Sequence, residues 1–148
     1  MKWSFGAAAL LALSGCSAGQ DKTAAEAGVA QFHRQLQAGD YHEIYRGAAA
    51  EFRQSGSENS AVRFLDTVNE RLGAVQRANQ QNWRVNFTSG GNMVILDYAT
   101  EFAHGRGVEN FVFRVQGGQA KLVGYHINSG DLISMPAAPL SQDSNATR

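Results

Sequence analysis

The amino-acid sequence predicts an α+β domain in which three N-terminal helices pack on one face of a curved, four- or five-stranded antiparallel meander. Two observations predict this fold. Apolar residues recur at spacings of three and four as far as Leu72, and from Trp83 onward they alternate with polar residues. The first spacing is typical of a helix with one buried side, and the second of a half-buried strand. Helices that precede such a sheet must cover its apolar face, so the two layers are segregated.

Three helices are expected, over residues 24–38, 41–54 and 60–72. Gly39 and Gly73 follow the first and the third, and glycine is common just beyond a helix end because it adopts the left-handed conformation easily. In each helix the apolar side chains share one stripe: Val29, Phe32 and Leu36 in the first; Tyr41, Ile44, Tyr45, Ala48 and Phe52 in the second; Phe64, Leu65, Val68 and Leu72 in the third.

The strands are expected to be joined by glycine turns at residues 90–91, 105–106 and 117–118, with residues 75–78 as a candidate fifth strand at the edge. A two-residue turn fixes which residues face each other, and all three turns place the same apolar set on one face. The expected pairs are Phe87–Val94, Val85–Leu96 and Trp83–Tyr98 at the first turn; Phe102–Glu109, Thr100–Phe111 and Tyr98–Phe113 at the second; and Val115–Ala120, Phe113–Leu122, Phe111–Gly124 and Glu109–His126 at the third.

The N-terminus has the form of a secretory signal peptide. Lys2 supplies a positive charge, and an apolar run over residues 5–13 follows it. The run is about half as long as a helix that crosses a bilayer, and it ends in small residues, as signal peptides do. A buried helix of the folded domain is the alternative, but the segment has no polar side.

Leu13-Ser14-Gly15-Cys16 resembles the bacterial lipobox, in which two small residues separate a leucine from a cysteine. The resemblance implies cleavage between Gly15 and Cys16, attachment of a diacylglyceryl group to the Cys16 thiol, and acylation of the new amine, as with palmitate. Ser17, which follows, is not acidic, so we expect the outer membrane, facing the periplasm. The alternative is an ordinary signal peptide with an incidental cysteine.

These patterns divide the chain into four parts. Residues 1–15 are the expected lipoprotein signal peptide, and residues 16–23 are the lipidated cysteine and a small, polar tether. Residues 24–135 form the single α+β domain, and residues 136–148, with two prolines among small and polar residues, are an expected disordered tail. The membrane is therefore a partner through the lipid anchor, and the domain lies close to its surface.

Composition narrows the classes of function. The 148 residues include 13 basic and 13 acidic residues, so the formal net charge is zero. A nucleic-acid-binding protein usually has a basic excess, and none is expected as a partner here. A single cysteine excludes an intrachain disulfide and a zinc site built on thiolates. His33, His42 and His104 do not have the spacing of metal ligands, so neither a metal nor a cofactor is expected.

Six short segments carry a family resemblance: Gln37-Ala38-Gly39-Asp40-Tyr41, Ile44-Tyr45, Phe52-Arg53, Arg71-Leu72-Gly73, Glu109-Asn110-Phe111 and Lys121-Leu122-Val123-Gly124-Tyr125. With them the chain resembles uncharacterised bacterial lipoproteins that carry a nuclear transport factor two-like (cystatin-like) α+β domain. This resemblance extends over residues 24–132. It implies a cone-shaped domain, and that fold supports enzymes such as ketosteroid isomerase, assembly domains and plain binding modules alike.

Five residues are candidates for a cavity or binding site. Trp83, Tyr98 and Thr100 are expected on the inner face of the sheet, where they either line a ligand cavity or fill the core. Glu109 and His126 are expected opposite each other at its end. They are either an acid–base pair at the mouth of a cavity or an ion pair that closes the core. No catalytic residue is assigned.

The expected function is a non-catalytic, lipid-anchored module of the bacterial envelope that binds a small ligand or a protein partner. One alternative is a small isomerase- or hydrolase-like enzyme that uses an interior cavity. Another is an assembly subunit of an envelope complex, which would expose a concentrated apolar patch. The sequence leaves the ligand, the partner and the oligomeric state open.

Overall fold

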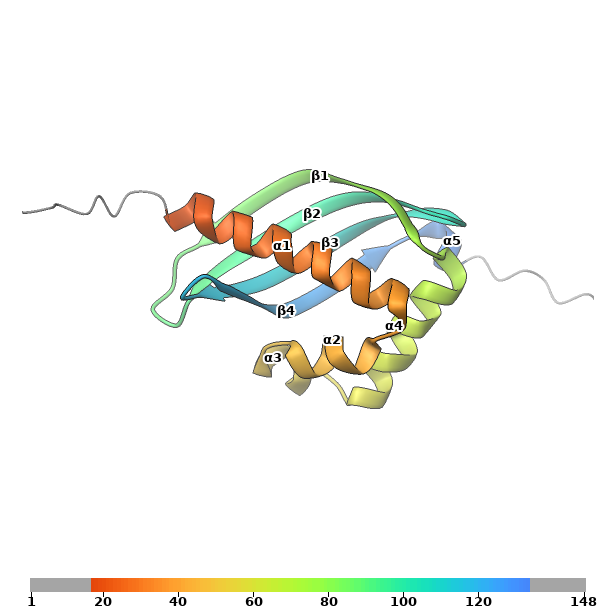
Figure 1. The fold of residues 1–148 in the computed structure, drawn as a ribbon, viewed down its shortest axis with the longest axis horizontal. Helices are drawn as coiled ribbons and strands as arrows, with labels where there is room; N and C mark the ends of the chain where they lie inside the picture. The colour runs from red at the N-terminus through yellow and green to blue at the C-terminus, as the bar shows by residue number, and fades with distance from the viewer. Residues whose placement is uncertain (1–16, 134–148) are drawn as a thin grey trace, which may run out of the picture.

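The change from helical spacing to alternation produces an α+β fold with an open four-stranded antiparallel sheet, in the order β1-β2-β3-β4 (Figure 1). The computed structural model describes residues 17–133. The elements follow the chain as α1 (Ser17–Ala38), α2 (Tyr41–Gly47), α3 (Ala50–Gln54), α4 (Glu58–Leu72), β1 (Val75–Asn86), β2 (Asn92–Phe102), β3 (Gly105–Gln116), β4 (Gln119–Asn128) and α5 (Gly130–Ile133).

The helices cover one face of the curved sheet, as the apolar stripes predict. Figure 1 shows α1 lying along that face, with α2 and α3 beside β4 and α4 at the far end. Phe32 and Leu36 of α1 are buried against a sheet face that includes Leu96 and Phe111, and Leu65, Val68 and Leu72 of α4 belong to the same core. The α+β class and the antiparallel meander are confirmed.

The prediction of a tether over residues 16–23 is wrong for residues 17–23, which the structure describes, because α1 begins at Ser17. Three contacts hold this first part of the helix. Thr23 donates a hydrogen bond to the Gly19 carbonyl, Lys22 pairs with Glu26, and the Asn92 amide donates to Asp21 at 2.6 Å. A small, polar segment is therefore folded because the end of the sheet supplies a partner.

Four helices precede the sheet instead of the three expected. The single helix predicted over residues 41–54 is divided into α2 and α3, because Ala48 and Ala49 have extended backbones. The Ala49 N–H donates to the Leu122 carbonyl of β4 at 2.8 Å. A tertiary hydrogen bond thus replaces the helical one, which local spacing cannot predict.

Two of the expected turns are wrong, yet the faces expected for the strands that they join, β1 to β3, are correct. The first loop is wider than two residues, since Val85 pairs with Val94. At the second turn, Phe102 pairs with Gly105, because the turn at Ala103 and His104 donates backbone hydrogen bonds to the end of α4. Both shifts of register are even, and an even shift keeps each side chain on its face.

The expected pairing of β3 with β4 is confirmed near the turn and wrong beyond it. Val115 pairs with Ala120, and Phe113 with Leu122, as predicted. Val123 then has no partner, because Val112 pairs with Gly124. This bulge exchanges the faces of the following residues, since one extra residue reverses the alternation.

The fifth strand does not exist as a separate element, since residues 75–78 are the beginning of the long strand β1. The register of β1 against β2 shifts twice, between Val75 and Arg77 and between Gln80 and Asn82. In the described part of the chain, none of the helices combines the length and the apolar composition needed to cross a bilayer. The expected signal peptide, Cys16 and the tail over residues 136–148 lie outside the described residues.

Candidate functional site

A buried carboxylate lies at the centre of the helix–sheet interface. Glu109 of β3 pairs in the sheet with Tyr98 of β2 and Ile127 of β4, and it points toward α1. Its exposed fraction is 0%. A carboxylate without water needs hydrogen-bond donors from the protein, because burial of an unpaired charge is costly.

Three side chains supply those donors, and each comes from a different element. The Thr100 hydroxyl of β2 donates to Oε2 of Glu109 at 2.5 Å, and the Tyr125 hydroxyl of β4 donates to Oε1 at 2.8 Å. Nε2 of His33, on α1, lies 2.9 Å from Oε2. All three groups can donate a hydrogen bond, so both carboxylate oxygens have partners within the domain. The cluster therefore ties α1 to three strands.

Aromatic rings surround this cluster. The ring centroids of Phe32 and Tyr125 are 4.5 Å apart, those of Phe111 and Tyr125 5.0 Å, and those of His33 and Phe111 5.7 Å. These spacings are typical of packed aromatic pairs. The space next to Glu109 is thus occupied by side chains of the domain, and the polar cluster is a satisfied part of the core.

Tyr125 connects the cluster to the surface. Burial, and then the charge of Glu109, raise the pKa of its phenol well above the ordinary value of 10.0. Burial also raises the pKa of Tyr98, with smaller contributions from Glu26 and Glu109. The hydroxyl of Tyr125 is therefore held as a donor to Glu109, while its ring lines a pocket at the surface.

This pocket has a volume of about 240 Å³ and lies where α3 and α4 meet β4. Phe52 and Phe64 approach it from the helices, and Phe64 is 43% exposed. The hydroxyl of Ser57 caps α4 by accepting from the Ser60 N–H, and the Ser55 hydroxyl donates to the Phe52 carbonyl. These polar groups are engaged within the chain, so the pocket offers a mainly apolar surface. Its lining is Phe52, Ser55, Gly56, Ser57, Ser60, Ala61, Phe64, Leu65 and Tyr125.

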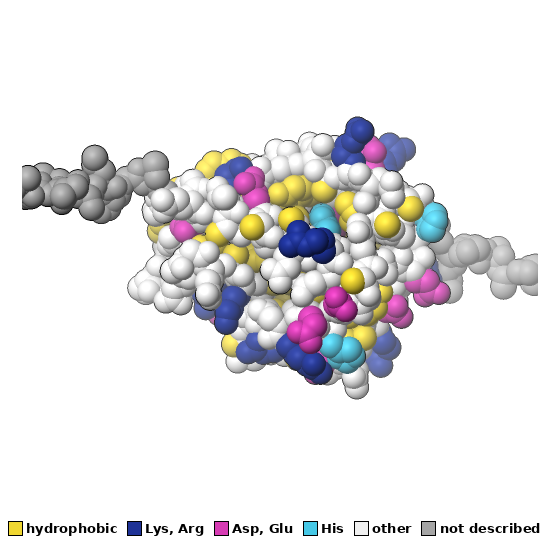
Figure 2. All heavy atoms as spheres, viewed as in Figure 1, with side chains coloured by type: hydrophobic (Ala, Val, Ile, Leu, Met, Phe, Trp, Pro, Cys, Tyr) yellow, Lys and Arg dark blue, Asp and Glu magenta, His cyan; other side chains and the backbone are white. Residues whose placement is uncertain are grey.

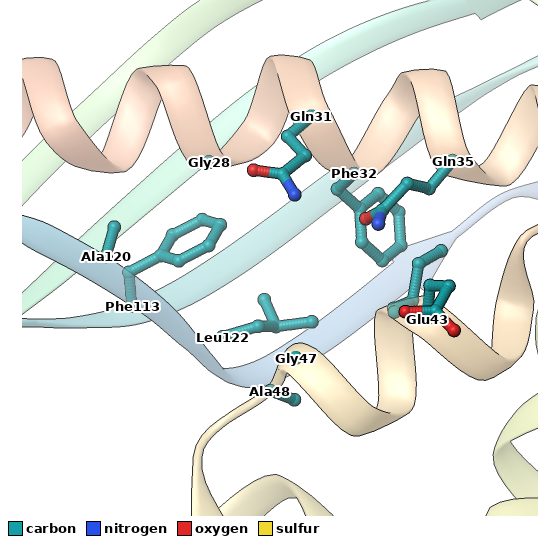
Figure 3. A pocket seen from close by; sticks show the side chains of 11 residues that line it. Gly28, Gln31, Phe32, Gln35, Glu43, Gly47, Ala48, Phe113, Ala120 and Leu122 are labelled. Carbon is teal, nitrogen blue, oxygen red and sulfur yellow. The ribbon is translucent and has the colours of Figure 1, made fainter.

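A second groove lies between α1, α2 and the sheet, and Figure 3 shows Phe32, Phe113 and Leu122 pointing into it. Its volume is about 70 Å³. Packing is tight there, because a Cβ on Gly28 would lie 2.7 Å from the Phe113 ring. An apolar cavity that holds one benzene molecule has a volume of about 150 Å³, so this groove is too small for a single aromatic ring.

One group of charged side chains lies over α2 and α4, at the bottom of the view in Figure 2. His42 lies 2.7 Å from Glu58, and Arg46 lies 3.4 Å from the same carboxylate. The hydrogen bond from His42, together with the charge of Arg46, lowers the pKa of Glu58. The ionic contacts join α2 to the start of α4.

The structure brings together only part of the candidate set of Trp83, Tyr98, Thr100, Glu109 and His126. Thr100 and Glu109 are bonded, and Tyr98 is paired with Glu109. His126 is not opposite Glu109, because the bulge at Val123 pairs it with Asn110 and leaves it exposed. Trp83 lies on the edge strand β1, where it pairs with Leu96, and is 43% exposed.

Two members of the cluster, His33 and Tyr125, are not among the site residues predicted from the sequence. His33 lies next to Phe32 on the apolar stripe of α1, four residues after Val29, which is the signal that could have found it. Tyr125 could not have been found in this way, because without the bulge it would point outward.

We expect the buried phenols to make the protein less stable at alkaline pH. The folded chain keeps the Tyr125 proton when the unfolded chain releases it near pH 10, so the free energy of unfolding falls as the pH rises above 10. The limiting slope is about 1.4 kcal/mol per pH unit for each such group. Urea unfolding between pH 8 and 11 measures it. Tyr125→Phe should have a shallower slope above pH 10, and equal slopes would contradict the assignment.

Comparison with known proteins identifies a family. A family model described as a protein of unknown function, DUF4019, matches residues 29–125. No curated protein matches the chain. The matched segment is more than half of the chain, and it contains all four residues of the buried cluster, from His33 to Tyr125. The chain therefore belongs to the DUF4019 family.

Proposed function

We propose that the chain is a bacterial envelope lipoprotein and that its domain, of the nuclear transport factor two-like type, is a non-catalytic binding module. The lipobox-like segment Leu13-Ser14-Gly15-Cys16 supports the anchoring. In this proposal the lipoprotein is located in the outer membrane and faces the periplasm. The pocket between α3, α4 and β4 is the binding site in this proposal.

The observation that carries the proposal is the way the pocket is built. Its volume of about 240 Å³ exceeds the size of an apolar cavity that holds one benzene molecule, about 150 Å³. Tyr125 forms part of the wall, and its hydroxyl is turned away from the pocket toward Glu109. The Tyr125 ring is therefore held in place, and the lining is mainly apolar, which suits one aromatic ring or one branched alkyl group. That group could belong to a small ligand or to a side chain of an envelope protein.

One observation favours a second candidate function, a small isomerase- or hydrolase-like enzyme. His33 and Glu109 are 2.9 Å apart and could act as an acid–base pair. A catalytic pair has to reach its substrate, however, and Glu109 is fully buried with three partners from its own domain. The binding module is therefore favoured over the enzyme.

Benzene is a suitable probe of the pocket. We expect it to cause saturable shifts in the amide signals of α4 and Tyr125 in NMR spectra of the unacylated chain, residues 17–148. Ala61→Leu places a larger side chain in the pocket wall and should abolish these shifts. Ala30→Leu is the matched control, because Ala30 is exposed on α1 and should leave the shifts unchanged. Shifts that do not saturate, or that survive in Ala61→Leu, would rule out this pocket as the binding site.

A further inference from the structure

Two large aromatic side chains are exposed in the part of the domain where α1 begins. Trp83 of β1 is 43% exposed, and Phe87, just beyond β1, is 63% exposed. Figure 1 shows the start of α1, the β1–β2 loop and the β3–β4 turn at the same end of the molecule. Antiparallel topology requires the two sheet turns to share an end, since alternate turns of a meander do.

Side-chain contacts fix the start of α1 to this part of the sheet. The ammonium of Lys22 lies 5.6 Å from the centre of the Trp83 ring, a cation–π contact. The Asn92 amide, at the start of β2, donates to Asp21 at 2.6 Å. Thr88 donates a hydrogen bond to the Gly91 carbonyl and so closes the loop that carries Phe87. The aromatic side chains therefore have a defined position relative to the first turn of α1.

We propose that Trp83 and Phe87 dock on the surface of the bilayer leaflet that holds the acyl chains of Cys16. The inference rests on the proposed anchoring. Cys16 directly precedes Ser17, the first residue of α1, so no flexible segment separates the anchor from the domain. Lys22 lies about 8 Å along the helix from Ser17, which is comparable to the thickness of the headgroup region of one leaflet.

The chemistry of the two side chains fits this partner. Tryptophan is enriched at membrane–water interfaces, where its ring contacts apolar chains and its N–H stays close to water. Phe87 follows Trp83 in the direction of the loop, so it reaches further toward the acyl chains. The positive charge of Lys22 is compensated by Glu26, and Asp21 keeps its negative charge beside the neutral Asn92 amide. Docking should therefore not require anionic lipid.

Fluorescence of Trp83 provides a direct test. The sequence has two tryptophans, and cleavage before Cys16 removes Trp3, so Trp83 is the single tryptophan of the mature chain. The mature lipoprotein is purified from bacterial membranes and reconstituted into phosphatidylcholine vesicles. The phosphatidylcholine is brominated either near the headgroup or near the end of the acyl chains. We expect bromine near the headgroup to quench Trp83 strongly, and bromine near the chain end to quench it weakly.

Two variants locate the contact. Phe87→Ser should lower the ratio of docked to undocked molecules about tenfold and reduce the quenching accordingly. Val108→Ser is the matched control, because Val108 is also exposed, at 54%, but lies toward the β2–β3 turn, away from the β1–β2 loop that carries Phe87. Val108→Ser should be quenched as strongly as the wild-type chain.

Each outcome bears on a different claim. Labelled palmitate that is incorporated into the wild-type chain, and not into Cys16→Ser, supports the anchor. A palmitoylated chain whose Trp83 is not quenched would overturn the docking and leave the anchor intact. Quenching that is unchanged in Phe87→Ser would overturn the docked arrangement. A chain that incorporates no palmitate would overturn both proposals.

Discussion

Glu109→Ala should lower the free energy of unfolding by about 3–5 kcal/mol, because it removes the acceptor of three buried hydrogen bonds. The hydroxyls of Thr100 and Tyr125 and the ring of His33 would remain in the core without their partner. The substitution also leaves a space beneath aromatic rings that are packed around the carboxylate.

Chemical unfolding with two further variants separates these contributions. Glu109→Gln keeps the volume of the side chain and one carbonyl oxygen, while Thr100 and His33 can each accept a hydrogen bond from its amide. Glu109→Gln should therefore lower the free energy of unfolding by a smaller amount, about 1–2 kcal/mol. Glu101→Ala removes an exposed glutamate from the same sheet and should stay within about 0.5 kcal/mol of the wild-type value. A loss of less than about 1 kcal/mol in Glu109→Ala would show that the cluster is not a stabilising centre.

The fold class was predictable because it depends on periodicity, which errors in local register do not erase. The β2–β3 turn lies at Ala103 and His104 instead of Gly105 and Arg106, yet Thr100 and Glu109 still share the inner face. The displacement is even, and a strand has a period of two. The apolar face, and hence the layered arrangement, was therefore predicted correctly although the turn was predicted at the wrong residues.

The buried cluster was only partly predictable, because it depends on a shift of register by one residue in β4. The bulge at Val123 brings Tyr125 to the inner face and sends His126 outward. Neither Val123 nor Gly124 is a specific signal of a bulge in the sequence. The partner of Glu109 on α1 was also hidden, since His33 comes from a helix 76 residues earlier in the chain. Periodicity gives the face of each residue but not which helix residue lies above which strand residue.

The two glycines that follow α1 and α4 also show that the sequence predicts a local conformation but not the neighbours that a residue meets in the fold. The sequence predicts both as residues that follow a helix, and both have positive φ, 76° at Gly39 and 73° at Gly73. Their surroundings differ. A Cβ on Gly39 would meet nothing within 4 Å, whereas a Cβ on Gly73 would lie 2.9 Å from Nδ1 of His104 and 3.1 Å from Cβ of Ala103. Only the structure can distinguish a glycine that satisfies the backbone from one that also leaves room for a neighbour.

This difference predicts unequal costs for the same substitution. Gly39→Ala should lower the free energy of unfolding by about 1 kcal/mol, the cost of a left-handed conformation for a residue with a Cβ. Gly73 combines its positive φ with a ψ of −163°, a region that essentially only glycine adopts. The new methyl group would also press against the β2–β3 turn, which is bonded to Leu72 and Ala74 at 2.8 Å. Gly73→Ala should therefore cost about 3 kcal/mol or more. Urea unfolding of the two variants measures the difference. Equal losses in the free energy of unfolding would mean that the β2–β3 turn moves away from the methyl group and is not held in place by its contact with α4.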